Sequence, residues 1–243
     1  MLDQSVIEFL GGVVNNFVLY FIDILLRLPG VIVAVMVHGF AQALASTALG
    51  SKEARAQKKL TLDPITHTDP VGFLCLLLFR FGWAYPVPAD FRHKSYPKLR
   101  RFVAIFAGPF ANLLVSFVGL FALIPFALPQ VVAFFNSSQV LVWTYGIIKT
   151  AIQSFCLINA NIALFNMIPL PPLDGFRLLS VFIPRRSYKN MMRYEKYFSL
   201  GFMIVLLIDY YFIGYVGDAL LMGSNFILND CFAGLINFIF FRG

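Results

Sequence analysis

The sequence predicts an all-α polytopic membrane protein, and three observations support that fold class. Hydrophobic residues make up 59% of the 243 residues, and the mean hydropathy is +0.78. Several long runs carry no charge, which is typical of helices that cross a bilayer of about 30 Å. Fifteen of the nineteen Lys and Arg fall in three loops, at residues 52–59, 80–101 and 185–196. Basic loops between apolar segments indicate a membrane protein with cytoplasmic loops rather than a nucleic-acid-binding protein.

The first 49 residues are expected to form two separate helices. Residues 4–23 carry polar side chains roughly along one stripe, which favours an amphipathic helix in the membrane interface over a spanning one. Pro29 suits the first turn of a second helix, and residues 28–49 match the ~20 residues that a span requires. His38 and Gln42 lie four residues apart within this span, so their side chains share one face.

The middle of the chain contains one short apolar segment and two long ones. Residues 71–79 are too short to cross a bilayer, and basic loops flank them on both sides. A re-entrant or membrane-edge segment fits both features, because the two loops are expected on the same side of the membrane. Residues 101–128 and 147–168 are predicted to span, and a short helix near residues 174–183 follows a cluster of prolines.

The last part of the chain is expected to add one more span. Residues 197–216 are apolar and long enough, and the run at residues 234–241 is expected as an outer-face helix or a half-inserted hairpin. The three cysteines lack a CxxC or zinc-ligand spacing, so we expect them to behave as small apolar side chains. One membrane domain covers residues 1–243, with an interfacial helix at 1–23, a core at 24–183, and a C-terminal span and tail at 184–243.

Six polar side chains fall at membrane depth, where a polar group without a partner is unfavourable. They are therefore candidates for a site that faces the protein interior. The asparagines among them also have a simpler interpretation, in which they cap broken helices and tie neighbouring spans together. No regular helix can continue through Pro169 and Pro171, so that segment is expected to be buried in protein or to line a wet cavity. The six are His38, Gln42, Asn112, Asn161, Asn166 and Asp174.

Residues 37–43 have the pattern of a zinc-binding helix from which key side chains are missing. The motif His-Glu-x-x-His places two imidazoles one turn apart, with the glutamate as a general base. Here His38 is the first histidine, Gly39 stands at the base position and Gln42 stands at the second histidine. Far downstream, Asp174 supplies a carboxylate after the proline cluster.

On these residues the chain resembles the site-2 protease family of intramembrane zinc metalloproteases, in its compact prokaryotic form. In that family the two helix histidines and a downstream aspartate bind zinc, while the glutamate activates water. The resemblance implies that only His38 and Asp174 match ligand positions. It is carried in order by residues 61–72, 82–88, 107–112 and 166–175.

The departures from the family pattern imply a pseudoprotease. A catalytic zinc takes three protein ligands and a water, whereas His38 and Asp174 provide two. The neutral amide of Gln42 is a poor replacement for imidazole, and Gly39 cannot accept a proton from metal-bound water. Loss of a general base alone lowers a rate by ~10²–10⁴. No cofactor is therefore expected. His67 is the one candidate that could rebuild the ligand set, although a capping or loop histidine is the favoured interpretation.

Three functions remain open at this point. The favoured one is a catalytically inactive membrane protein that binds or regulates a transmembrane protein or peptide through the former active-site cleft. The alternative is an active intramembrane zinc metalloendopeptidase with a non-standard metal site, for which zinc would be the cofactor. A transporter is disfavoured because the sequence shows no internal repeat. The cleft is expected to include Asn112, Asn161, Asn166, Pro169 and Pro171.

The resemblance also bears on location and partners. It implies an integral membrane protein, in a prokaryotic plasma membrane, and the charge pattern puts the three basic loops in the cytoplasm. The lipid bilayer and a membrane-protein partner are expected, nucleic acid is not, and the oligomeric state stays open.

Overall fold

The regular structure of the chain is helical. The structure, a computed structural model, describes residues 4–91, 93–209, 215–226 and 230. Within these residues every regular element is a helix, apart from one isolated antiparallel bridge between Thr68 and Ala84. The elements are α1 (Gln4–Ala48), α2 (Glu53–Ala56), α3 (Pro64–His67), α4 (Pro70–Phe79), α5 (Pro97–Phe121), a 3₁₀ turn (Ile124–Ala127), α6 (Pro129–Phe135), α7 (Gln139–Asn166), α8 (Asp174–Leu179), α9 (Arg185–Met192), α10 (Glu195–Ile208) and α11 (Tyr215–Asn225).

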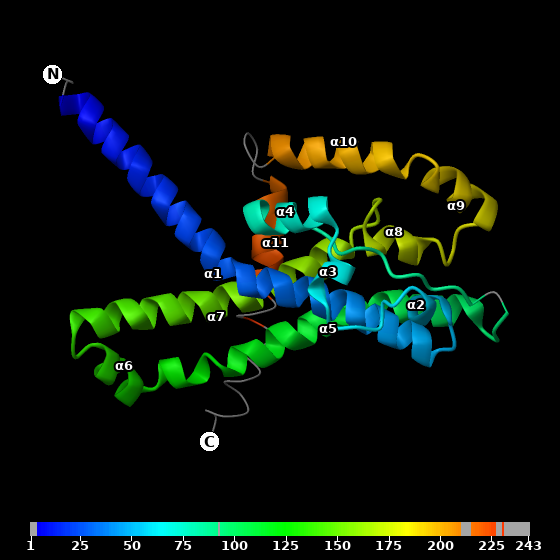
Figure 1. Cartoon of the computed structure of the whole chain (residues 1–243), viewed down its shortest axis with the longest axis horizontal. Helices are drawn as coiled ribbons and strands as arrows, with labels where there is room; N and C mark the ends of the chain where they lie inside the picture. Colours follow the sequence, from blue (N-terminus) through cyan, green and yellow to red (C-terminus); the bar gives the residue numbers. More distant parts are fainter. Residues whose placement is uncertain (1–3, 92, 210–214, 227–229, 231–243) are drawn as a thin grey trace.

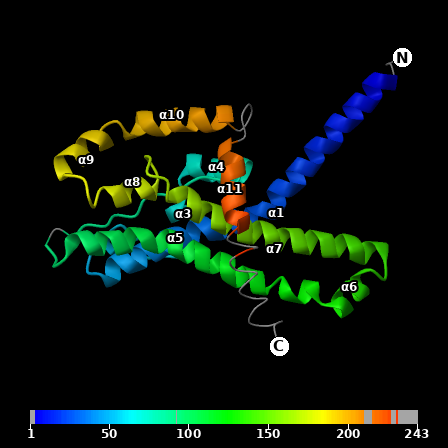
Figure 2. The same ribbon diagram turned by 180° about the vertical axis from the view of Figure 1, so that it is seen from behind.

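Three long helices form the centre of the molecule. Helices α1, α5 and α7 pack against one another, and both ribbon views show the three side by side (Figures 1 and 2). Their apolar stretches are long enough to cross a bilayer, at Asn16–Ala48, Pro97–Phe121 and Gln139–Asn166. The predicted polytopic all-α fold is therefore confirmed. Helix α5 starts and ends earlier than expected, and α7 begins earlier and ends at Asn166, before the proline cluster.

The expected break in the first 49 residues does not occur. Helix α1 is continuous, and Pro29 lies inside it rather than in the first turn of a new helix. A proline inside a helix removes one backbone hydrogen bond, but helices packed in a membrane protein tolerate this loss when neighbours supply other partners. Gly30 follows directly, and a Cβ atom there would lie 3.0 Å from the Cα of Phe155 in α7. The Pro-Gly pair therefore marks a close helix contact and not a boundary. Whether residues 4–23 lie in the interface stays a prediction.

The short apolar segment forms a helix that is too short to cross. Helix α4 begins after Asp69, whose side chain accepts hydrogen bonds from the backbone N–H groups of Val71 and Gly72. It ends at Arg80, which has a left-handed backbone with φ of 68°. Ten residues of α-helix extend only about 15 Å, half of a bilayer core. Helix α4 packs against α1, so the segment stays at the edge of the helical centre.

The expected last span has a different form. Helix α10 has 14 residues and ends at Ile208. That length is about 21 Å, less than the ~30 Å of a bilayer core, so the described part of residues 197–216 is shorter than predicted. Helix α11 follows and packs against α7. Residues 210–214, the run at 234–241 and Cys231 lie outside the described residues. The other two cysteines, Cys75 and Cys156, are buried and free, as expected for small apolar side chains.

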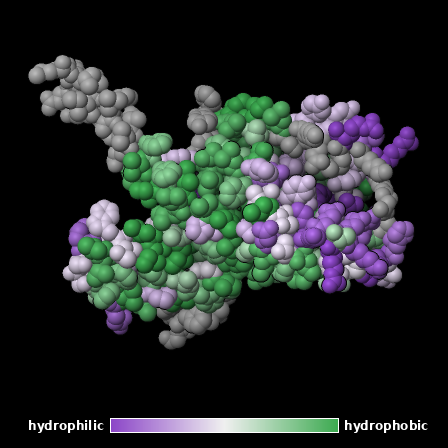
Figure 3. Space-filling view, viewed as in Figure 1, coloured by the Kyte–Doolittle hydropathy of each residue, from purple (hydrophilic) through white to green (hydrophobic). Residues whose placement is uncertain are grey.

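The three basic loops meet at one end of the molecule. Figure 3 shows hydrophilic side chains gathered over the end formed by α2, α9 and the start of α5, while hydrophobic side chains cover most of the remaining visible surface. Arg80 is an exception, since it lies beside α1 and its guanidinium donates to Asp23 at 3.1 Å. A shared end is what a common side of the membrane requires, and the cytoplasmic assignment of that side stays a prediction.

Candidate functional site

The residues predicted from the sequence meet around His38, in the middle of the helical centre. His38 lies on α1 and is 2% exposed. Its Nδ1 lies 2.8 Å from Oδ1 of Asn112 on α5, and its Nε2 lies 2.7 Å from Oδ2 of Asp174 at the start of α8. Three elements that are distant in sequence are thus joined through one imidazole.

The hydrogen bonds of Asn112 indicate the protonation of that imidazole. The Asn112 amide donates from Nδ2 to the carbonyl of Ala34 at 2.9 Å and to Oδ1 of Asn159 at 3.0 Å. Its Oδ1 is therefore an acceptor, and His38 Nδ1 must carry a hydrogen. On the other side of the ring, Nε2 lies 2.7 Å from Asp174 Oδ2 and 3.2 Å from Nε2 of Gln42. Both ring nitrogens of His38 are engaged.

Gln42 lies one turn after His38 and bonds to two different groups. Its Nε2 donates to Oδ2 of Asp174 at 2.5 Å and to the carbonyl of Ile105 at 3.1 Å. Ile105 is four residues before Pro109, which has no N–H to complete the helical hydrogen bond. The glutamine amide therefore satisfies a backbone carbonyl that the proline leaves without its helical donor, and α5 continues through Pro109.

Gly108 makes this arrangement sterically possible. A Cβ atom at Gly108 would lie 2.7 Å from His38 Nε2 and 2.9 Å from Gln42 Nε2. Any larger residue would separate α5 from the polar face of α1, so the Gly108-Pro109 pair brings the two helices into contact and provides the carbonyl acceptor.

Arg177 completes the centre, and the sequence analysis did not identify it. Its Nη1 donates to Oδ1 of Asp174 at 2.6 Å and to Oε1 of Gln42 at 3.2 Å, and its Nη2 donates to the carbonyl of Val87. Asp174 is 5% exposed and accepts from this guanidinium on one oxygen and from Gln42 on the other. The signal was available, because Arg177 follows Asp174 by three residues on one helix and such pairs are neighbours.

The space beside Gly39 is filled by His67. A Cβ atom at Gly39 would lie 2.2 Å from Nδ1 and 2.4 Å from Cγ of the His67 ring. His67 is the last residue of α3, and its Nε2 donates to the carbonyl of Thr61 at 2.9 Å, a local bond consistent with the favoured capping role. The ring is nonetheless fully buried, its Nδ1 has no hydrogen-bond partner, and burial lowers the pKa of His67, so the ring is neutral.

The other predicted cleft residues lie apart from this hydrogen-bond network. Asn161 donates to the carbonyl of Arg80 at 3.1 Å, and Asn166 donates to the carbonyl of Gly82 at 3.2 Å. Both asparagines are buried, and both attach the chain after α4 to helix α7. Pro169 is exposed and Pro171 is buried. The simpler interpretation describes the contacts of Asn161 and Asn166, whereas Asn112 belongs to the His38 centre.

An apolar groove lies next to the proline segment. Its volume is about 520 Å³, and its walls are the segment before α8 and one face of α10. Pro171 is thus a predicted cleft residue that lines this groove. The lining residues are Leu170, Pro171, Tyr194, Tyr197, Phe198, Gly201 and Phe202.

The donor set of the His38 centre does not fit a zinc ion. Zinc needs neutral imidazole lone pairs and free carboxylate oxygens. Here the two candidate ligands lie 2.7 Å from each other, and the Arg177 guanidinium puts a positive charge 2.6 Å from the same carboxylate. Among the residues that the structure describes, no three His, Cys, Asp or Glu side chains are grouped as a metal site requires. No catalytic step through zinc is derived from this arrangement.

Comparisons with known proteins identify the family of the chain. The family model of peptidase family M50 matches residues 3–208. A protein of Bacillus subtilis (strain 168), named "Putative zinc metalloprotease YwhC", is 33% identical over 186 residues, which cover 73% of this chain and 76% of that protein. Two mycobacterial proteins, both named "Putative zinc metalloprotease Rip2", are more distant. The Mycobacterium tuberculosis protein (strain ATCC 25618 / H37Rv) is 26% identical, with 74% of this chain and 65% of that protein covered. The Mycolicibacterium smegmatis protein is 24% identical, with 76% and 66% covered.

No solved structure matches the chain significantly. The family model nevertheless spans the three long helices, the His38 centre and all of α10. This chain therefore belongs to peptidase family M50, the site-2 protease family.

Proposed function

We propose that this chain is a non-catalytic member of the family that binds a membrane-protein partner. The observation that carries the proposal is the ion pair between Arg177 and Asp174 within the closed network around His38. The network satisfies the two residues that match zinc-ligand positions with protein hydrogen bonds. At the positions of the general base and the second histidine stand Gly39 and Gln42, which can neither take up a proton nor offer an imidazole.

The apolar groove beside Pro171 is the proposed place for the partner. On the α10 side the groove is lined by Tyr197 and Phe198. Both side chains are exposed although they are large and hydrophobic. Since the lining has aromatic and aliphatic side chains only, we assign it an apolar transmembrane segment of another protein. The groove is also linked to the centre along the chain, because Pro171 lies three residues before Asp174.

A pair of glycine substitutions tests the groove. Gly201 lines the groove, and Gly146 is an exposed residue of α7. A Cβ atom at either position would meet nothing within 4 Å. Gly201→Leu should fill the groove, while Gly146→Leu makes the same chemical change elsewhere. With a photo-crosslinking residue at Tyr197, we expect one specific adduct with a membrane protein in native membranes. Gly201→Leu should abolish it and Gly146→Leu should preserve it.

The control position for the crosslinker is Trp143, which is 67% exposed on α7 and does not line the groove. An equal adduct from Tyr197 and Trp143, or an adduct that survives Gly201→Leu, would show that the groove has no specific partner. Either result would remove the binding part of the proposal while leaving the question of catalysis open.

One observation favours the alternative, an intramembrane zinc metalloendopeptidase with a non-standard site. The buried Nδ1 of His67 has no partner and lies beside Gly39, where the family places its general base. A neutral imidazole can accept a proton or bind a metal. Metal quantification on protein purified without added metal and without a histidine tag separates the two functions. We expect less than about 0.1 zinc per chain; stoichiometric zinc that is lost in His38→Ala would favour the protease.

The family relatives and the three apolar helices are consistent with a bacterial plasma membrane. We further propose that the end with α2 and α9 faces the cytoplasm, since positive charge is retained on that side. A cysteine at exposed Lys94 should then react with a membrane-impermeant maleimide only after the cells are opened.

A further inference from the structure

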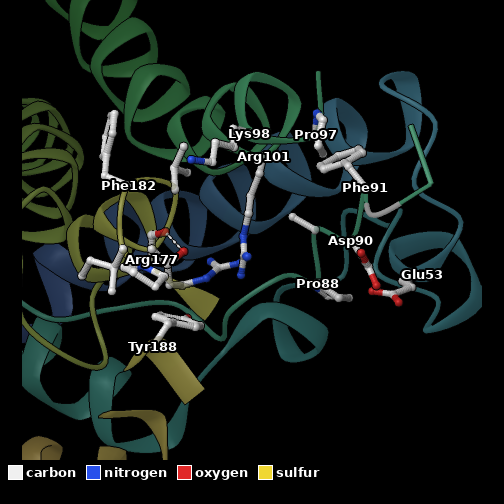
Figure 4. Close-up of a pocket in the computed structure, with 15 residues that line it drawn as sticks. Glu53, Pro88, Asp90, Phe91, Pro97, Lys98, Arg101, Arg177, Phe182 and Tyr188 are labelled. Atoms are coloured by element: carbon white, nitrogen blue, oxygen red, sulfur yellow. Dashed lines mark hydrogen bonds between the residues drawn. The ribbon is translucent and has the colours of Figure 1, made fainter. Parts of the chain in front are cut away.

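A second cavity lies at the end of the molecule where the three basic loops meet. Its volume is about 750 Å³, and residues from α2, the chain before α5, α5, α8 and α9 line it. Figure 4 shows Arg101 and Arg177 extending into the same part of the cavity from α5 and α8, with Tyr188 beside them. Glu53 and Asp90 lie at the opposite side of the same view. The cavity therefore has a cationic part and an acidic part.

The two guanidinium groups are held in place by their surroundings. Arg101 lies over the ring of Tyr188, with 5.5 Å between its Cζ atom and the ring centre, and that ring stacks on Phe176. Arg177 is fixed by Asp174, and its side chain is 12% exposed. Fixed guanidinium groups lose little conformational freedom when an anion binds, and their planar N–H forks match the oxygens of a phosphate. Lys98 adds a third positive charge and is exposed.

We propose that the cationic part of this cavity binds a phosphate group, carried either by an anionic lipid headgroup or by a soluble phosphate compound. Arg101 and Lys98 add positive charge beside Arg177, which pairs with Asp174, and guanidinium groups bind phosphate oxygens through charge-assisted hydrogen bonds. The acidic part, with Glu53 and Asp90, would repel a second phosphate and so confines the anion to the side of Arg101 and Arg177. This inference is independent of whether the chain is catalytic.

Arg177 connects this cavity to the His38 centre. One nitrogen of its guanidinium donates to Asp174 and Gln42, while the group also lines the cavity. A bound phosphate competes with Asp174 for the same cation. Occupancy of the cavity therefore loosens the hydrogen bonds of the centre, and any change that strengthens the Arg177–Asp174 pair weakens phosphate binding to the same extent.

The test uses the full chain in phosphatidylcholine nanodiscs and two probes. One arm titrates inorganic phosphate, and the other measures by native mass spectrometry whether phosphatidylglycerol is retained over phosphatidylcholine. We expect the wild-type chain to bind at least one probe, with binding that weakens as salt rises. The double variant Lys98→Gln with Arg101→Gln should bind about tenfold more weakly or worse, as expected for lost charge-assisted contacts.

The matched control is Lys52→Gln with Lys94→Gln, which removes the same charge from exposed positions outside the cavity. It should bind like the wild type. Lys98→Gln alone serves if the double variant fails to fold, because Lys98 is exposed and its loss disturbs no packing. Retention of phosphatidylglycerol alone identifies a lipid headgroup, and binding of inorganic phosphate identifies a soluble source. A wild-type chain that binds neither probe, or an equal loss in both double variants, would overturn the proposal.

Discussion

The His38 centre and the basic cavity are two polar regions that share Arg177, and they differ in how their polar groups are used. In the centre, the imidazole, the carboxylate and the glutamine amide are bonded to one another and to backbone carbonyls. In the cavity, cationic side chains border a space of about 750 Å³. The contrast separates polar side chains that are bonded to one another inside the fold from polar side chains that border a cavity. The following changes test that division.

Removing the carboxylate of the centre should have the largest effect. Asp174→Asn leaves the Arg177 guanidinium without its anion and His38 Nε2 without its carboxylate partner, and breaking a buried ion pair destabilises a protein by about 3–5 kcal/mol. Thermal and denaturant unfolding in detergent would measure it. Asp218→Asn, at an exposed position on α11, is the control and should change stability by less than about 0.5 kcal/mol.

A partial recovery is expected when Arg177→Gln is combined with Asp174→Asn, because both members of the pair are then neutral. If Asp174→Asn were as harmless as Asp218→Asn, the centre would not stabilise the fold, and the comparison with the cavity would fail.

Filling the space beside Gly39 should have the next largest effect. The Cβ of Gly39→Ala would lie 2.2 Å from a ring atom of His67, and such overpacking costs about 1–3 kcal/mol. Gly146→Ala should instead stabilise α7 by up to about 1 kcal/mol, since its Cβ meets nothing. Unfolding midpoints would measure the two changes in stability, which are expected to have opposite signs.

His67→Ala should relieve most of the strain in Gly39→Ala, because only the contact with the His67 Cβ at 2.8 Å remains. A Gly39→Ala variant as stable as the wild type would mean that His67 does not pack there, and the position would be open to a general base.

Cutting the link between Gln42 and the backbone should have a moderate effect. Gln42→Ala leaves the Ile105 carbonyl and one oxygen of Asp174 without that donor, which costs about 1–3 kcal/mol. In a Pro109→Ala background the residue at 109 has an N–H that reaches Ile105, so the same substitution should cost less. A double-mutant cycle measured by unfolding gives the coupling, and a coupling of zero would contradict the role of Gln42 on α5.

Zinc should have the smallest effect. Because the His38 centre is saturated by protein groups, we expect addition or chelation of zinc to leave the unfolding temperature unchanged. A metal that binds only the folded chain would raise stability by about 2.7 kcal/mol at one hundred times its dissociation constant. Such a rise, lost in His38→Ala, would instead favour the metalloprotease.

The sequence predicted most residues of the His38 centre, but it did not predict all of the contacts around them. His38, Asn112 and Asp174 were identified because polar residues at membrane depth are unfavourable without a role, and the structure brings them together. Arg177 was missed although it follows Asp174 by three residues. The contact of His67 with Gly39 could not be predicted, because it depends on where α3 packs against α1 and no local pattern encodes that.

The sequence predicted helix ends that depend on local chemistry, but it missed helices that continue because of packing. Helix α7 ends before the proline cluster, because no neighbour can replace several lost backbone donors at once. Pro29 and Pro109 do not end their helices, since one lost bond is tolerated inside a packed bundle. Near Pro109 the replacement donor to the Ile105 carbonyl comes from Gln42, 63 residues before Ile105 in the chain, and no local rule identifies it.

The hydrogen bond from Gln42 to Ile105 also limits how the chain can evolve. A mutation that restores histidine at position 42 would return a metal ligand but withdraw the amide that completes the helix around Pro109. Gln42→His is therefore expected to destabilise the fold unless Pro109 is replaced first. A glutamate at position 39 would clash with the His67 ring unless His67 is also replaced. A complete His-Glu-x-x-His pattern is therefore separated from the present sequence by several ordered substitutions, each unfavourable alone.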